Sequence, residues 1–92
     1  MTKDDIIKAI GNDGRAIIKF GASWCGPCKQ VNKVLEELPE YITVVEVDVD
    51  EEDDLVSEFG IKNIPALFYY VNGQQVNKSV GSISREELLN KF

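Results

Sequence analysis

Apolar side chains recur at helical spacing in several segments of the chain. The clearest helical face consists of four apolar residues at positions i, i+3, i+4 and i+7, namely Val31, Val34, Leu35 and Leu38. Polar capping residues, glycine or proline bound these segments, as is typical of helix ends. The spacing therefore predicts helices over residues 2–10, from the Cys25–Cys28 segment to about Leu38, over 51–59 and from Ser84 onward.

Other apolar segments have the length and the β-branched content of strands. They are residues 16–20, 43–49 and 66–71. Asn72-Gly73 is a strong hairpin signal, so residues 75–80 should return antiparallel to the preceding strand. Near-continuous apolar strands usually lie inside a covered sheet, and the strand–helix–strand unit over 16–49 implies parallel pairing. We expect an α/β fold in a single domain, 1–92, with a mixed four-stranded sheet flanked by helices.

The charge balance narrows the possible partners. The formal net charge is −6, so the cationic surface that phosphate binding needs is missing, and no nucleic-acid partner is expected. No apolar run approaches the ~18 residues of a membrane helix, so no membrane partner is expected either. The polar N-terminus lacks the features of a secretory signal, which favours a cytoplasmic location. The acidic run 50–54 is interpreted as a solvated helix start, with an acidic docking surface or a weak Ca²⁺ site as alternatives.

The cysteine and histidine content limits the chemistry. The chain has two cysteines, Cys25 and Cys28, and no histidine. Two cysteines three residues apart do not make the framework of a secreted disulfide-rich domain. A structural zinc site usually needs four Cys or His ligands, so no metal is expected. Without histidine there are no Cys–His or Ser–His nucleophile pairs, and thiol redox or carboxylate chemistry remains.

The two cysteines lie between a predicted strand and a predicted helix, at the start of the helix. The unpaired N–H groups and positive dipole end of a helix N-terminus favour a thiolate at Cys25 and should lower its pKa. Cys28 lies one turn along, within reach to attack a mixed disulfide on Cys25. Gly26 permits close approach of a partner backbone, and Pro27 suits the first helical turn. The alternatives are an incidental pair of buried cysteines or half of a metal site.

The segment Trp24–Lys29 (Trp-Cys-Gly-Pro-Cys-Lys) resembles the active-site motif of the thioredoxin family. The resemblance extends over nearly the whole chain, through Phe20–Ser23, Val47–Asp50, Phe59–Ala66, Asn72-Gly73 and Val80-Gly81. It implies a thioredoxin-like fold with the strand order 43–49, 16–21, 66–71, 75–80. The N-terminal strand common in the family has no residues to form it here, so strand 43–49 should be an exposed edge.

The resemblance also implies a function and a set of site residues. The chain would reduce protein disulfides by dithiol–disulfide exchange, with Cys25 as the exposed nucleophile and Cys28 as the resolving thiol. The Ile64–Pro65 peptide bond would be cis, with Pro65 against the dithiol and the Ile64 backbone ready to pair with an extended substrate. A shallow apolar docking surface would consist of Trp24, Gly26, Pro27, Ile61, Ile64, Pro65, Val80 and Gly81. For each of these residues ordinary packing is the alternative.

Electrons would come from NADPH through a separate thioredoxin reductase. The chain has no nucleotide-binding glycine motif, so no cofactor is expected to be bound apart from the redox-active Cys25–Cys28 disulfide itself. Use of glutathione as the donor, as in glutaredoxins, is the nearest variant. Two other classes remain as rivals, a binding protein that uses the scaffold as a processivity or assembly subunit and a metallochaperone that holds a soft metal with two thiolates.

Two further departures from the family concern single residues. Lys33 stands where the family's long helix usually carries a kinking proline, which predicts a straighter helix. Lys19 and Glu46 stand where the family has a buried aspartate and its lysine partner, so the two signs are exchanged. We hypothesise a charge pair under Cys28, in which the ammonium helps to stabilise the thiolate and Glu46 receives a proton. The alternative is that Lys19 reaches solvent and Glu46 faces water.

Overall fold

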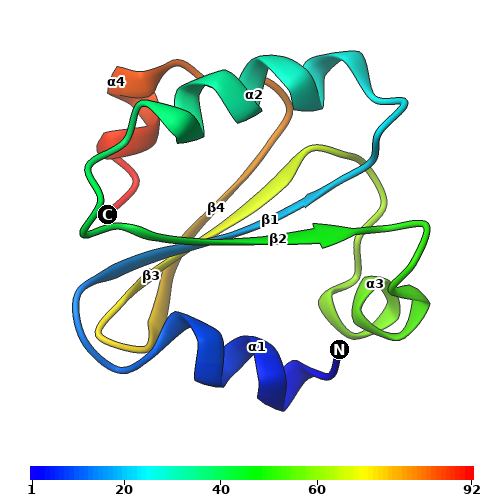
Figure 1. Ribbon diagram of the computed structural model, residues 1–92, viewed down its shortest axis with the longest axis horizontal. Coiled ribbons are helices and arrows are strands. Elements are labelled where there is room, and N and C mark those ends of the chain that lie inside the picture. The colour runs from blue at the N-terminus through cyan, green and yellow to red at the C-terminus, as the bar shows by residue number, and fades with distance from the viewer.

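The computed structural model describes all residues from 1 to 92 as two layers of helices around one mixed sheet (Figure 1). The elements in chain order are α1 (Lys3–Ile10), β1 (Arg15–Gly21), α2 (Gly26–Glu36), β2 (Thr43–Asp48), α3 (Asp53–Phe59), β3 (Ala66–Val71), β4 (Gln74–Val80) and α4 (Arg85–Leu89). The sheet order is β2-β1-β3-β4, with β1 and β2 parallel and the other pairs antiparallel. The predicted strand order is confirmed, and β2 is an edge strand.

Local signals set most of the element ends. The Thr2 side chain accepts a hydrogen bond from the Asp5 N–H, and the Asp5 carboxylate accepts one from the Thr2 N–H, which completes a capping box. Gly60 ends α3 in the left-handed conformation. Asn72 and Gly73 both have positive φ, as a tight hairpin turn requires.

Two helices are shorter than the pattern predicts. Helix α2 ends at Glu36 rather than near Leu38 because the residue before Pro39 is disfavoured in the helical conformation. The next two N–H groups instead bond three residues back, with Leu38 donating to the Leu35 carbonyl over 3.2 Å. Helix α3 begins at Asp53 rather than at residue 51, since Glu52 N–H donates to the Asp48 carbonyl in a preceding turn.

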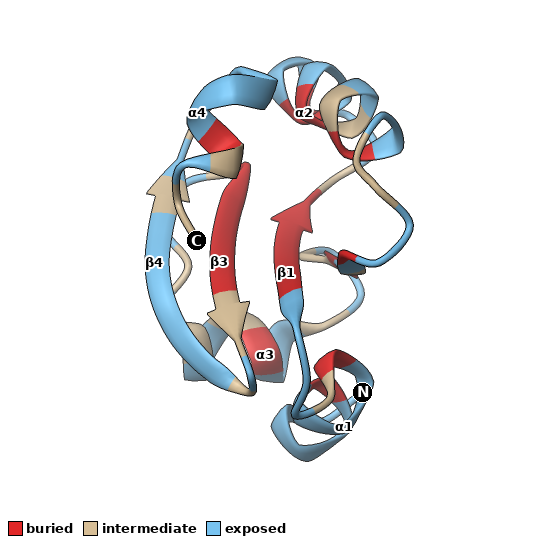
Figure 2. Ribbon diagram, turned by 90° about the vertical axis from the view of Figure 1, so that its left-hand side faces the viewer, coloured by how far each residue is buried: buried red, intermediate tan, exposed pale blue.

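The hydrophobic core has one part on each face of the sheet. On the face covered by α1 and α3, Phe20 packs against Phe59 and Phe68, with ring centroids 5.1 and 5.7 Å away. The part on the other face, beneath α2 and α4, consists of Ile17, Val31, Leu35, Ile42, Leu67, Tyr69 and Leu88. Figure 2 shows that the central strands β1 and β3 are the buried ones, whereas β4 is largely exposed. No helix has the length and apolar character needed to cross a membrane.

One charged side chain interrupts this core. Lys19 lies in the middle of β1 with only 5% of its surface exposed, among neighbours that are apolar. Burying an ammonium costs free energy unless it is hydrogen-bonded or paired. The Lys19 ammonium therefore requires a polar partner within the fold.

Candidate active site

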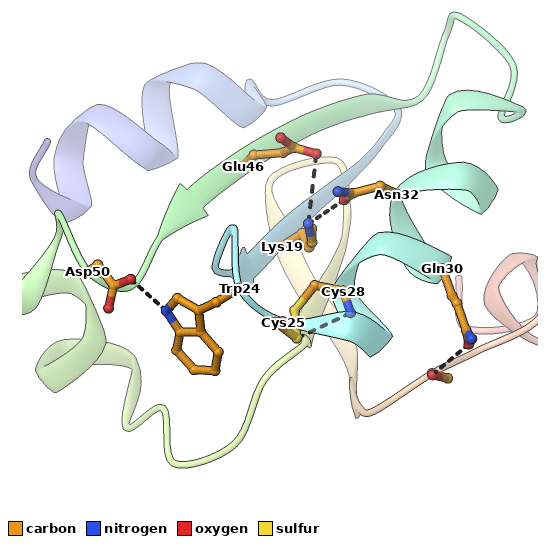
Figure 3. Close-up of a disulfide and its surroundings, with 9 residues drawn as sticks. Lys19, Trp24, Cys25, Cys28, Gln30, Asn32, Glu46 and Asp50 are labelled. Atoms are coloured by element: carbon orange, nitrogen blue, oxygen red, sulfur yellow. Dashed lines mark hydrogen bonds and ion pairs between the residues drawn. A yellow bond between two sulfur atoms is a disulfide. The ribbon is translucent and has the colours of Figure 1, made fainter.

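Cys25 and Cys28 form a disulfide at the start of α2 (Figure 3). Cys25 is the N-cap residue of this helix, and its Sγ accepts a hydrogen bond from the Cys28 N–H over 3.2 Å. Pro27 lies in the first turn, where its missing N–H leaves no donor unpaired. The Cys-Gly-Pro-Cys spacing thus places both sulfur atoms within one helical turn, as a reversible disulfide requires.

Cys25 is buried in this oxidised state, so the expectation of an exposed nucleophile is wrong for the disulfide form. Its exposed fraction is 5% and that of Cys28 is 1%. The N-cap position explains the burial, since it turns the Cys25 side chain back onto the first turn of α2. Cys25 nevertheless remains the more accessible of the two sulfur-bearing residues.

The electrostatics at the start of α2 favour an anion. The first turn contains no acidic residue, so nothing cancels the partial positive charge of the free N–H groups there. The Cys28 N–H already points at Cys25 Sγ. A hydrogen bond of this kind strengthens when the sulfur is a thiolate. The site is therefore arranged to hold negative charge on Cys25 once the disulfide opens.

Lys19 reaches the same region from β1. Its Nζ donates a hydrogen bond to Asn32 Oδ1 on α2, and Glu46 Oε1 on β2 lies 4.0 Å away (Figure 3). The hypothesised charge pair with Glu46 is thus present at the limit of ion-pair distance, but the Glu46 side chain is 61% exposed. The alternative in which Lys19 reaches solvent is wrong, because its side chain is only 6% exposed.

Asn32 was not among the predicted site residues. A signal for it is present in the sequence, since Asn32 follows Cys28 by four residues and so lies on the same face of α2. Nothing in that spacing reveals that a buried lysine on β1 would need an acceptor there. The contact depends on how α2 crosses the sheet, which the local pattern does not determine.

Gly21 leaves the space in which Lys19 and Cys28 approach each other. A Cβ at this position would lie 3.1 Å from Lys19 Nζ and 3.2 Å from Cys28 Sγ, closer than such atoms normally come. A side chain at this position would therefore have to displace the ammonium or the sulfur. A small cavity of about 190 Å³ also opens onto Lys19, Gly21, Asn32 and Glu46, and it connects the ammonium with the surface.

The environment of Lys19 gives a prediction for stability. Burial lowers the pKa of Lys19 below its ordinary value of 10.5, and Glu46 offsets this only in part. The unfolded chain therefore binds more protons between the lowered pKa and the ordinary one, so the free energy of unfolding should rise with pH in that window. Lys19→Met should remove this rise and leave stability at neutral pH equal or greater.

Urea unfolding at several pH values between about 8 and 10 measures this effect. Lys33→Met is the matched control, because it removes an exposed lysine from the protein and should keep the rise. Burial raises the pKa of Tyr69 and Tyr70 above the ordinary value of 10.0, so their contribution has the opposite sign and is confined to the upper end of this range. An unchanged slope in Lys19→Met would show that Lys19 is not penalised by burial.

Several of the residues predicted to dock substrate line two small cavities. Trp24, Ile61 and Ile64 together line an apolar cavity of about 250 Å³. The Ile64–Pro65 peptide bond is cis, as predicted, and Pro65 accepts a hydrogen bond from the Gly81 N–H over 2.8 Å. The remaining three predicted residues are Gly26 and Pro27 at the start of α2, and Val80, which lines a second small cavity with Ile61.

Trp24 is held by a contact that the pattern did not indicate. Its side chain is 68% exposed, and its indole N–H donates to Asp50 Oδ2 over 2.8 Å. Asp50 belongs to the acidic run 50–54, which therefore does more than begin a solvated helix. Glu52 of the same run pairs with the N-terminal ammonium at 3.2 Å. The structure gathers no group of three or more His, Cys, Asp or Glu side chains that could hold a metal ion.

Comparisons with known proteins agree with this geometry. The model of the thioredoxin family matches residues 1–92. Thioredoxin of Bacillus subtilis is 37% identical, with 96% of this chain and 91% of the relative covered, and thioredoxin of Alicyclobacillus acidocaldarius is 36% identical, with 96% and 88% covered. A mutant thioredoxin from Halobacterium salinarum superimposes with a TM-score of 0.86 at 28% identity, with 98% of this chain and 81% of that chain covered.

Proposed function

The chain belongs to the thioredoxin family and is a thiol–disulfide oxidoreductase, and we propose that its substrates are the disulfides of proteins. The observation that carries the proposal is the Cys25–Cys28 disulfide at the N-terminus of α2, beside an apolar surface with an exposed tryptophan. Exposed aromatic and aliphatic side chains next to a reactive group favour an unfolded or extended polypeptide as substrate.

The exchange proceeds in two displacements. The Cys25 thiolate attacks one sulfur of the substrate disulfide, and the other substrate sulfur leaves as a thiolate that takes a proton from water. The Cys28 thiolate then attacks Cys25 Sγ, the bond between Cys25 and the substrate breaks, and the second substrate sulfur leaves. The two electrons gained by the substrate come from the dithiol, which ends as the disulfide seen in the structure.

The remaining predicted residues support these steps. Trp24, Ile61 and Ile64 offer apolar contact for the substrate chain at one cavity, and Val80, the residue before Gly81, offers it at a second. We assign Lys19 a supporting role at Cys28 through its positive charge. Glu46 is mainly exposed and only at the limit of pairing, so its part is proton exchange with solvent rather than a tight ion pair.

The proposed electron donor is a separate thioredoxin reductase that draws on NADPH, in the cytoplasm. The test is insulin disulfide reduction with thioredoxin reductase and NADPH, run against glutathione with glutathione reductase. We expect turnover with the first system and little with the second, since a Gly-Pro pair between the cysteines is typical of thioredoxins. Turnover with glutathione alone would contradict the donor assignment, and no insulin reduction with either would contradict the substrate class.

A further inference from the structure

We propose that Asn32 is a positioning residue that holds the Lys19 ammonium next to Cys28, so that the resolving thiolate of this protein forms beside a buried cation. The inference rests on the proposed function, because it assigns an environment to the thiol that resolves the mixed disulfide. It concerns the second displacement only. The attack by Cys25 takes place at the helix N-terminus and does not depend on it.

The contacts of the Lys19 ammonium support the positioning role of Asn32. Lys19 Nζ donates to Asn32 Oδ1 (Figure 3), and Gly21 leaves no Cβ between Nζ and Cys28 Sγ. Asn32 lies one helical turn beyond Cys28, so its amide oxygen is fixed by the same helix that carries the resolving sulfur. A lysine side chain has several rotatable bonds, and the hydrogen bond restricts it to the position beside the sulfur.

The groups around the ammonium do not neutralise it at close range. The titratable groups facing it are two carboxylates from β2 and one thiol from α2, namely Glu46, Asp48 and Cys28. Glu46 stands 4.0 Å away and is mostly in water, where its charge is screened. On the other side, β3 places the apolar Leu67 opposite Lys19. The neutral Asn32 therefore satisfies the ammonium without cancelling its charge.

The chemical consequence is a thiolate on Cys28 that exists at lower pH. An opposite charge within about 4–6 Å stabilises the ionised form by one to three pKa units. The proton lost by Cys28 passes to solvent, to which the cavity beside Lys19 and Gly21 opens. The thiolate then displaces the substrate sulfur from Cys25, as described above. Removing the cation or its anchor should therefore slow the second displacement and leave the first one unchanged.

Stopped-flow oxidation of the reduced protein by an equimolar amount of dithiobis-nitrobenzoate separates the two steps. The first coloured thiolate appears when Cys25 attacks the probe, and the second appears when Cys28 attacks Cys25 Sγ. Lys19→Met should raise the pH midpoint of the second phase by at least about one unit. At a pH below the midpoint, the second phase of this variant should therefore be about tenfold slower than that of the unmodified protein. Asn32→Ala should move the midpoint up by about half a unit, roughly threefold in rate.

Two further variants distinguish positioning from a general effect on packing. Asn32→Asp keeps an acceptor for the ammonium but adds a negative charge, so the shift should be as large as in Lys19→Met. Lys33→Met removes an exposed lysine from the same helix and should leave the second phase unchanged. A wild-type second phase in both Asn32 variants would overturn the inference. Loss of the first phase in the unmodified protein would instead overturn the proposed function.

Discussion

Replacing Cys25 with serine is expected to abolish insulin reduction, bringing turnover to the level seen without protein. The hydroxyl of serine is not ionised at neutral pH and does not attack a disulfide, so neither displacement can begin. The matched variant Cys28→Ser should behave differently. Its Cys25 still attacks the substrate, but nothing displaces the product, so the mixed disulfide accumulates. The measurement is turnover combined with intact-mass analysis of the protein under non-reducing conditions.

The two variants together test which cysteine attacks the substrate first. A stable adduct on Cys28→Ser together with none on Cys25→Ser supports the assigned order of attack. An adduct on Cys25→Ser instead would exchange the two roles, since Cys28 would then be the attacking thiol. Such a result would also conflict with the 1% exposure of Cys28.

Phe20→Ala is expected to lower the free energy of unfolding by about 3–5 kcal/mol, the usual range for truncating a buried aromatic side chain. Phe20 is fully buried, and its ring lies 5.1 Å from that of Phe59 and 5.7 Å from that of Phe68. Small domains are stable by only about 5–15 kcal/mol in total, so this loss would leave a marginal protein.

Chemical denaturation of the oxidised protein measures the change. Tyr41→Ala is the matched control, because Tyr41 is 72% exposed and its truncation should change stability by less than about 0.5 kcal/mol. Equal effects of the two substitutions would show that the aromatic cluster beneath β1 does not hold the sheet to α3. The disulfide loop follows β1 directly, so loss of this packing would also reduce activity through loss of folded protein.

The local part of this structure could be predicted from the chain itself. The Thr2 and Asp5 capping box, the Asn72-Gly73 turn and the Ser84 cap involve residues at most three positions apart. Their geometry depends on backbone groups of the same segment, so the residue types suffice to place them. The strand order needed the family resemblance, because spacing alone does not determine which strands lie side by side.

The contacts that shape the site lie beyond such local reasoning. The hydrogen bond between Lys19 and Asn32 joins residues 13 positions apart, and the one between Trp24 and Asp50 spans 26 positions. Both hydrogen bonds depend on how α2 and the loops around Trp24 and Asp50 pack against the sheet. The burial of Cys25 has a similar cause, since the pattern shows a helix start but not the direction in which the N-cap side chain turns.

The fold activates Cys25 by placing it at the start of α2, and the rate at which Cys25 is alkylated measures this activation. Reduced protein and a synthetic peptide of residues 22–30 would be treated with iodoacetamide at about pH 6 and followed by mass spectrometry. So short a peptide does not form a stable helix, so its cysteines react as free thiols do. We expect Cys25 in the protein to be modified at least about tenfold faster. Equal rates in protein and peptide would show that the fold does not activate Cys25.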